Sequence, residues 1–333
     1  MAGDGSETAE ALWYVGPGKA EIRAEPIAAP GAGEVRVRAL FSALSRGTER
    51  LVFSGGVPES EYKHMGAPFM GGAFPYPVKY GYAMVGRVEA GPATLQGKLV
   101  FALYPHQTVF NLAEKDVVAL PEGVSPERAA LAANMETALN ATWDGAADRA
   151  RHIAVVGAGV LGLLVARLCS RMPGVTVTAV DIAPARADVA RKLGIAFAAP
   201  SDAPTECDLV VHTSASEAGL ATALRLAGNE ATVLELSWYG SKEVKVALGG
   251  AFHRRRLKLV SSQVGQVAPS HRACWTHRRR LEAALKLLDD PALDALLAPP
   301  VAFADLPARL PGILDPASGA LCQLIRYPAA VAA

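Results

Sequence analysis

Three glycines between a short apolar run and a predicted helix constrain this chain more than any other feature. The run covers residues 152–156, and the loop that follows has the spacing G-x-G-x-x-G. In such a strand–turn–helix unit the first glycine allows a tight turn, the second lets the backbone approach a pyrophosphate, and the third lets helix and strand pack closely. The helix N-terminus then attracts the phosphates. The residues expected to contact a dinucleotide here are Gly157, Gly159, Val160, Leu161 and Gly162.

A carboxylate follows the next apolar run. Residues 176–180 predict a second strand, and Asp181 comes directly after it. A carboxylate in this position accepts hydrogen bonds from the ribose hydroxyls of NAD and would repel the 2′-phosphate of NADP. Arg186 follows closely, and its guanidinium would weaken that preference. The sequence therefore favours NAD(H) over NADP(H) as the cofactor.

The patterns along the chain predict an α/β protein with two domains. Residues 11–122 form short alternating runs divided by Gly and Pro, which is typical of an antiparallel, barrel-like β domain. From residue 125 to about residue 265, short apolar strands alternate with helical stretches, which indicates a doubly wound parallel sheet of the Rossmann type. We expect the last segment, with a strand over 321–326, to return to the first domain. The expected domains are residues 1–124 with 272–333, and residues 125–271.

Composition excludes several classes of protein. The chain has 333 residues and a formal net charge of +1, which is too small for the basic face of a nucleic-acid-binding protein. The most apolar run, residues 153–166, is too short for a membrane span of about 20 residues, and no signal-peptide pattern opens the chain. The four cysteines are scattered without a C-x-x-C pair, which favours reduced thiols and a cytoplasmic location. We expect neither nucleic acid nor a membrane as a partner.

The order of these parts resembles the medium-chain dehydrogenase/reductase superfamily. The similar stretches are residues 31–38, 120–127, 157–162 and 180–186. The resemblance implies a GroES-like β-rich catalytic domain, a Rossmann domain, a C-terminal return to the first domain, a small-molecule substrate and a homodimer. It also implies further cofactor contacts, which are Thr137, Thr213, Ser237 and Trp238. The alternative for Trp238 is that it only packs in the interior.

The chain departs from the zinc-dependent members of that superfamily at every metal ligand. Ser45 stands where their first ligand is cysteine, and Tyr82 stands where the second is histidine. The third position falls at Ala133 or Asn134, and no cysteine precedes Cys169 to build a structural zinc lobe. Zinc in proteins is held by thiolates, imidazoles or carboxylates. We therefore predict that the protein binds no metal.

Without zinc, hydrogen-bond donors must polarise a carbonyl and deliver a proton to it. Tyr82 is the first candidate, unless it only fills the space that a metal would occupy. Ser45 and Thr48 either relay the proton or cap the following helix. His106 lies in a loop expected to face the substrate cleft, as a proton shuttle or as a plain surface histidine. Glu136 is either a general base near Tyr82 or the partner of an arginine.

Two arginine runs, residues 254–256 and 278–280, are interpreted as solvated faces. The alternative for the first run is contact with an anionic substrate group or a cofactor phosphate.

Three functions fit these features. The first is a zinc-independent oxidoreductase that transfers hydride between NAD(H) and a secondary alcohol or ketone. The second is an NAD(P)H-dependent reductase of an activated C=C bond, of the enoyl or quinone reductase type. The third is a non-catalytic dinucleotide-binding protein. We favour the first because of the glycine loop, Asp181 and the hydroxyl groups at the former metal positions.

Overall fold

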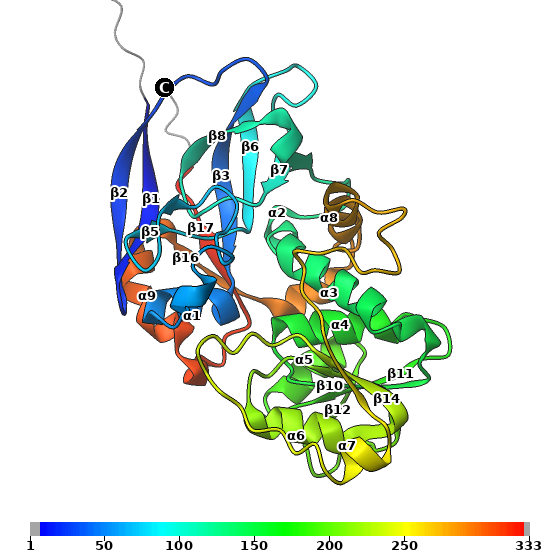
Figure 1. The fold of residues 1–333 in the computed structure, drawn as a ribbon. Helices are drawn as coiled ribbons and strands as arrows, with labels where there is room; N and C mark the ends of the chain where they lie inside the picture. Colours follow the sequence, from blue (N-terminus) through cyan, green and yellow to red (C-terminus); the bar gives the residue numbers. More distant parts are fainter. Residues whose placement is uncertain (1–6, 330–333) are drawn as a thin grey trace, which may run out of the picture. The chain divides into compact units, whose positions relative to one another are not determined.

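A computed structural model describes residues 7–329 of the chain, and the contacts between their Cα atoms divide them into two units (Figure 1). The first unit runs to Ala133 and resumes at Leu297, and the second is Asn134–Leu296. Both boundaries lie later in the chain than the sequence predicts, at 133/134 and 296/297 instead of 124/125 and 271/272.

The first unit is built mainly from antiparallel strands. Its larger sheet has the order β16-β17-β3-β6-β7-β9, with β8 also paired to β3, and its smaller sheet has the order β2-β1-β5-β4. The predicted C-terminal return is confirmed, because β17 pairs with β3 and places Gln323 opposite Leu44. The strands are β1 (Glu7–Gly16), β2 (Lys19–Ile27), β3 (Glu34–Leu44), β4 (Gly71–Gly72), β5 (Val78–Lys79), β6 (Met84–Ala90), β7 (Leu99–Ala102), β8 (Val109–Ala113), β9 (Val117–Ala119), β16 (Leu297–Ala302) and β17 (Cys322–Arg326). The helices are α1 (Arg46–Ser54), α2 (Pro126–Ala129) and α9 (Leu306–Leu314).

The second unit is a Rossmann fold. Its six strands are all parallel and have the order β12-β11-β10-β13-β14-β15. The chain order therefore reverses between β10 and β13, and ligands of such sheets bind beyond the carboxyl ends of the strands at this switch point. The strands are β10 (His152–Val156), β11 (Thr176–Val180), β12 (Ala196–Ala198), β13 (Cys207–His212), β14 (Ala227–Glu235) and β15 (Lys258–Ser261). The helices are α3 (Ala132–Asp144), α4 (Val160–Ser170), α5 (Arg186–Lys192), α6 (Glu217–Leu226), α7 (Ala251–Arg254) and α8 (His277–Lys286).

The predicted fold class, an α/β protein with a β-rich domain and a doubly wound parallel sheet, is confirmed. Within residues 7–329, every helix is too short or too polar to span a bilayer.

Helix α8 lies in the second unit because a buried arginine ties it to α3. Arg280 is 1% exposed, and its Nε donates to Oε1 of Glu136 at 3.0 Å while its Nη1 donates to Oδ1 of Asn140 at 2.6 Å. Arg280 also donates to the carbonyl oxygens of Val264 and Gln266. The prediction of a solvated face is wrong for Arg280. Its contacts also explain why the second unit extends past residue 271.

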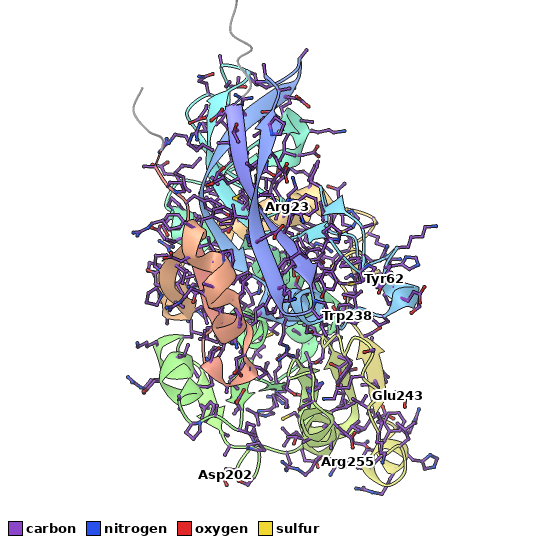
Figure 2. All side chains as sticks on the ribbon, turned by 90° about the vertical axis from the view of Figure 1, so that its left-hand side faces the viewer. Arg23, Tyr62, Asp202, Trp238, Glu243 and Arg255 are labelled. Carbon is purple, nitrogen blue, oxygen red and sulfur yellow. The ribbon has the colours of Figure 1, made fainter. Side chains whose placement is uncertain are left out.

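Two residues of the other arginine run, Arg255 and Arg256, contact carboxylates or a backbone oxygen, and Arg254 is exposed. Arg255, labelled in Figure 2, donates from Nη1 to the carbonyl oxygen of Ala227 at 2.6 Å and forms an ion pair with Glu206. Arg256 pairs with Glu230 at 3.1 Å. These contacts fix α7 against the start of β14.

Candidate cofactor and catalytic sites

The glycine loop joins β10 to α4, and two of its glycines leave no room for a side chain. Gly157 has a φ of 107°, and a Cβ atom there would lie 2.7 Å from Oγ1 of Thr213. A Cβ atom on Gly162 would lie 1.9 Å from the carbonyl oxygen of Gly157. At Gly159, in contrast, no atom lies within 4 Å of such a Cβ. The first and third glycines thus serve the fold of the loop, whereas the second leaves open space beside its backbone.

Thr213 holds the loop from the neighbouring strand. It follows β13 directly, and its hydroxyl donates to the carbonyl oxygen of Gly157 at 2.8 Å. The loop and Thr213 therefore meet at the point where the strand order reverses, which is the usual place for a dinucleotide in this fold.

Asp181 lies beside the same loop. Its Oδ2 accepts a hydrogen bond from the N–H of Ala158 at 2.7 Å, and its Oδ1 accepts one from the N–H of Ala183 at 2.9 Å. The carboxylate is partly exposed and keeps acceptor capacity for further donors such as hydroxyl groups. Arg186 is the first residue of α5 and is also partly exposed. The loop, the acid and the basic side chain predicted for the cofactor therefore all belong to the second unit.

The remaining predicted cofactor contacts lie on two other elements of this unit. Ser237 follows β14, and its Oγ accepts a hydrogen bond from the N–H of Ala215 at 3.0 Å. Trp238 is the next residue and is half-buried. Thr137 lies in α3 and is also partly exposed. Its neighbour Glu136 pairs with Arg280, so the expected alternative of an arginine partner is the one observed.

In the first unit, two of the predicted catalytic hydroxyls are in contact. The Tyr82 hydroxyl donates to Oγ of Ser45. Ser45 precedes α1 but makes no capping hydrogen bond with its side chain, so that alternative is not observed for Ser45. Burial raises the pKa of Tyr82, and hydrogen bonds with Ser45 and Thr48 lower it by less. The phenol therefore stays protonated at neutral pH and can donate to an oxygen that gains negative charge.

His106 is not the cleft-facing histidine that the sequence predicts. It is 0% exposed, with Nε2 2.9 Å from Oε2 of Glu49 and Nδ1 2.8 Å from Oγ of Ser42. Because a carboxylate only accepts hydrogen bonds, Nε2 carries the proton toward Glu49, and Nδ1 accepts from Ser42. With both ring nitrogens occupied inside the unit, His106 has no free nitrogen for a solvent-facing shuttle.

Glu49 is the centre of this buried network and was missed in the sequence. It is 0% exposed and also accepts from the hydroxyl of Tyr14 at 2.6 Å and from the N–H of Ser45 at 2.8 Å. Burial and the adjacent carboxylate raise the pKa of Tyr14, so its phenol remains a donor. Glu49 thus fixes the backbone of Ser45, which in turn holds Tyr82. No local pattern marks a glutamate in the first turn of a helix as buried, because acidic residues are common there for electrostatic reasons.

The residues that the sequence resemblance aligns with zinc ligands do not suit zinc. Ser45 and Tyr82 offer hydroxyl groups, and either candidate for the third position, Ala133 or Asn134, lacks a ligand that zinc prefers. Within residues 7–329, no group of three or more His, Cys, Asp and Glu side chains is placed to hold a metal ion.

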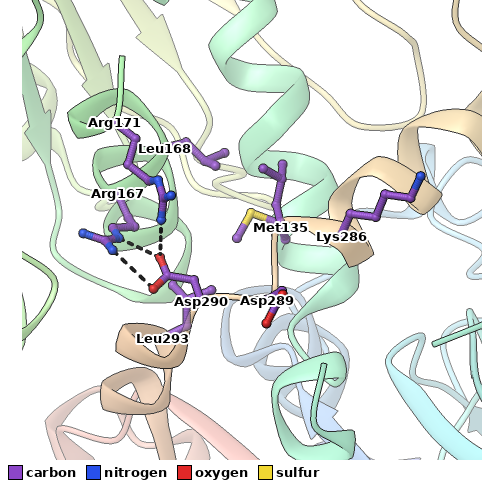
Figure 3. Close-up of a pocket in the computed structure, with 9 residues that line it drawn as sticks. Met135, Arg167, Leu168, Arg171, Lys286, Asp289, Asp290 and Leu293 are labelled. Atoms are coloured by element: carbon purple, nitrogen blue, oxygen red, sulfur yellow. Dashed lines mark hydrogen bonds and ion pairs between the residues drawn. The ribbon is translucent and has the colours of Figure 1, made fainter. Parts of the chain in front are cut away.

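A cavity of about 140 Å³ in the second unit lies at the end of α4 that is far from the glycine loop (Figure 3). Its two arginines are already paired, since Asp290 accepts from Nε of Arg167 at 2.8 Å and from Nη1 of Arg171 at 3.2 Å. Burial raises the pKa of Asp290, but the arginine hydrogen bonds outweigh this and leave its pKa below the usual value. We interpret this cluster as a structural tie between α4 and the 3₁₀ helix Pro291–Leu296, not as an anion site.

No protein-family profile and no curated protein sequence matches the chain. Solved structures do match it over nearly its whole length. L-Idonate 5-dehydrogenase from Escherichia coli K-12 superimposes with a TM-score of 0.79 at 12% identity, covering 96% of this chain and 99% of that one. The chain has the fold of these dehydrogenases. An alcohol dehydrogenase from E. coli CFT073 in complex with NADH gives a TM-score of 0.75 at 16% identity, covering 97% and 100% of the two chains.

A third structure extends the comparison to the other nicotinamide cofactor. A protein assigned as a zinc-binding dehydrogenase from Sinorhizobium meliloti 1021, bound to NADP, gives a TM-score of 0.75 at 17% identity and covers 96% and 99% of the two chains. Neighbours with this fold therefore carry either NADH or NADP.

Proposed function

We propose that this chain is a nicotinamide-dependent oxidoreductase of the medium-chain dehydrogenase type that acts, without zinc, on a secondary alcohol or ketone. The observation that carries the proposal is the close packing of Gly157, Gly162 and Thr213 at the switch point, with Asp181 bonded to the same loop. That arrangement leaves an open helix N-terminus and a carboxylate side by side, which suits a pyrophosphate and a ribose diol. The structural neighbours that carry NADH or NADP support the same reading.

In this proposal the second unit holds the cofactor and favours NAD(H). The glycine loop receives the pyrophosphate, and Asp181 accepts hydrogen bonds from the ribose hydroxyls. Arg186, Thr137, Ser237 and Trp238 complete the cofactor contacts. When bound, the nicotinamide supplies or accepts the hydride.

The first unit supplies the polar groups that replace a metal. Tyr82 donates a hydrogen bond to the substrate oxygen and gives up its proton as charge develops there. For this step the phenol proton turns from Ser45, which accepts it in the structure, to the substrate oxygen. Ser45 then donates its own proton to the phenolate, and Thr48, which also bonds the phenol, passes on a proton taken from water. His106 and Glu136 have no acid–base role in this proposal, because His106 is bonded to Glu49 and Glu136 is paired with Arg280.

A pair of alanine substitutions in the glycine loop separates folding from cofactor binding. Gly162→Ala places a methyl group against the carbonyl oxygen of Gly157, so we expect both a lower Tm and loss of NADH binding. Gly159→Ala meets no atom within 4 Å, so the Tm should stay within about 2 °C while NADH binding weakens by about tenfold or more. Thermal unfolding and NADH fluorescence titration measure the two effects. Unchanged NADH binding in Gly159→Ala would contradict a pyrophosphate at this loop.

The substrate class is tested with NADH and matched panels of ketones and 2-enones. Faster turnover of the ketones supports the proposal. Faster turnover of the 2-enones would instead support reduction of a C=C bond. Tight NADH binding without turnover of any compound would support a non-catalytic dinucleotide-binding protein.

The edge of the Rossmann sheet supports a homodimer as part of this proposal. Among the strands within residues 7–329, β15 pairs only with β14, and its apolar residues Leu259 and Val260 are 39% and 38% exposed. An exposed apolar edge strand favours pairing with a second copy. Leu259→Lys is therefore expected to shift the protein from dimer to monomer in analytical ultracentrifugation. Leu287→Lys is the control, because Leu287 is 38% exposed but lies at the end of α8, and it should leave the mass unchanged.

All four cysteines are free thiols, and three of them are buried. We include the cytoplasmic location in the proposal, because a reducing compartment suits unpaired thiols.

A further inference from the structure

A serine, a histidine and a glutamate form a continuous relay at the carboxyl edge of the Rossmann sheet. His212 ends β13, and its Nε2 lies 2.7 Å from Oγ of Ser214. Its other ring nitrogen, Nδ1, lies 2.7 Å from Oε2 of Glu235, the last residue of β14. The histidine side chain is 0% exposed, whereas Ser214 is exposed.

The carboxylate, which only accepts hydrogen bonds, determines the tautomer of the histidine in this relay. The Glu235 carboxylate only accepts, so Nδ1 of a neutral His212 donates to it and Nε2 is left as an acceptor for the hydroxyl of Ser214. Burial raises the pKa of Glu235, but hydrogen bonds with His212 and Ser237 outweigh this and leave its pKa below the usual value. Tyr239 adds a further donor to Glu235 at 3.1 Å. The carboxylate is therefore held ionised. Oγ of Ser214 lies 2.7 Å from Nε2 of His212 and 2.9 Å from Oγ of Ser216, so the histidine is one of two acceptors within reach of the serine proton.

The backbone around Ser214 has the form of a strand–serine–helix turn. Ser214 lies between β13 and α6, and the next residue, Ala215, has a φ of 50° in the left-handed region. Ser216 caps α6 by accepting from the N–H of Gly219 at 3.0 Å. The first turn of α6 thus follows directly, and the free N–H groups and dipole of a helix N-terminus favour negative charge beside the serine. Nucleophilic serines of α/β-hydrolases also lie on a strand-to-helix turn, of the pattern G-x-S-x-G. Here His212 and Ser216 stand at the two glycine positions of that pattern.

Gly219 provides the space for the serine–histidine contact. A Cβ atom at this position would lie 2.0 Å from Oγ of Ser214 and 2.7 Å from Nε2 of His212. Any larger residue would displace one of the two groups. The absence of a side chain at Gly219 therefore allows Ser214 and His212 to come into contact.

We propose that Ser214, His212 and Glu235 form a nucleophilic triad that is acylated by carboxylic esters with good leaving groups, an activity separate from hydride transfer. Ser214 Oγ bonds to the ester carbonyl carbon while its proton passes to Nε2 of His212, and Glu235 stabilises the resulting imidazolium. The bond from the carbonyl carbon to the alcohol oxygen then breaks, and the alcohol leaves with the proton from His212. Water attacks the acyl-serine, gives a proton to His212 and releases the carboxylic acid, and that proton returns to Ser214.

The triad lies beside the proposed cofactor loop, since a Cβ atom on Gly157 would lie 2.9 Å from the backbone nitrogen of Ser214. Bound NADH should therefore shield the serine. Ester turnover is expected in the nucleotide-free protein and should fall as NADH is added.

The test is labelling of the full-length protein with a fluorophosphonate probe, followed by mass spectrometry of the labelled peptide. We expect one adduct at Ser214 and none in Ser214→Ala. Glu235→Gln, which keeps the shape of the side chain, should slow labelling by at least about tenfold, because the imidazolium loses its counter-charge. Gly219→Ala should slow it as well. Hydrolysis of p-nitrophenyl acetate should follow the same order of variants.

Ser270 provides the matched control. Its Oγ lies 2.9 Å from Nδ1 of His271, but that ring stacks on Trp143 with centroids 4.2 Å apart. Ser270→Ala should leave labelling unchanged. Absence of an adduct, an adduct at another serine, or equal labelling in Glu235→Gln would each overturn the triad. Thermal unfolding of each variant excludes loss of fold as the cause. A protein that binds no NADH but is labelled at Ser214 would refute the proposed function and leave the triad in place.

Discussion

Tyr82→Phe is expected to lower kcat for ketone reduction by about 10²–10⁴-fold, the usual contribution of a positioned proton donor. The phenol is the group that touches the substrate oxygen in the proposed function, and phenylalanine keeps the ring but removes the donor. Because the proposed cofactor contacts lie in the second unit, NADH binding should stay within about twofold of the wild type. Steady-state kinetics with NADH and NADH fluorescence titration measure the two quantities.

Tyr80→Phe is the control for this substitution. Its ring lies 6.1 Å from that of Tyr82, and its hydroxyl donates to the carbonyl oxygen of Met65 at 3.2 Å. Loss of that hydroxyl should leave kcat within about threefold, because one hydrogen bond to the backbone is removed without touching the proton donor. Equal activity in Tyr82→Phe and Tyr80→Phe would mean that Tyr82 only fills space.

The raised pKa of Tyr82 also predicts how kcat for ketone reduction depends on pH. Burial raises the pKa of Tyr82 above the usual value near 10, so the donor form persists throughout the neutral range and into mildly alkaline solution. Ionisation of Tyr82 should therefore cause no loss of kcat below about pH 10. A fall in kcat with a midpoint near pH 7 would require a different proton donor.

Local sequence patterns predicted the Rossmann unit well because its signals are short in range. The strands at 152–156 and 176–180 and the glycine loop between β10 and α4 are each specified by neighbouring residues, and the structure has both strands with those bounds. Asp181 likewise needs only its place after a strand. Its hydrogen bond to the N–H of Ala158 follows from the pairing of β10 with β11.

The polar interior could not be predicted in the same way. Arg280 and Glu136 are 144 residues apart in the chain, and His106 and Glu49 are 57 apart. Each of these side chains belongs to a type that is mostly exposed or intermediate, and only its partner makes burial tolerable. The arginine run and the histidine loop were therefore interpreted as surface features, although two of their side chains are buried.

Glu49→Ala is expected to lower the free energy of unfolding by about 3–5 kcal/mol, the range found when one member of a buried charged network is removed. The carboxylate accepts from Tyr14, His106 and the N–H of Ser45, and alanine would leave these donors buried without an acceptor. Urea unfolding followed by circular dichroism measures the loss. Tyr14→Phe should cost only about 1–2 kcal/mol, because it removes a single hydrogen bond and leaves Glu49 bonded to the other two donors.

Asp188→Ala is the surface control for Glu49→Ala. Asp188 pairs with Arg191 at 2.8 Å, but the two side chains are 76% and 73% exposed, so its loss should leave the free energy of unfolding nearly unchanged. If Glu49→Ala costs no more than Asp188→Ala, the network is not what stabilises the first unit. If Glu49→Ala costs several kcal/mol, Glu49 stabilises the first unit and also positions Ser45 by accepting a hydrogen bond from its N–H.

Glu49→Gln keeps the shape of the side chain. It should lower kcat by less than Tyr82→Phe, because it weakens the hydrogen bonds that position Ser45 but leaves the proton donor Tyr82 in place.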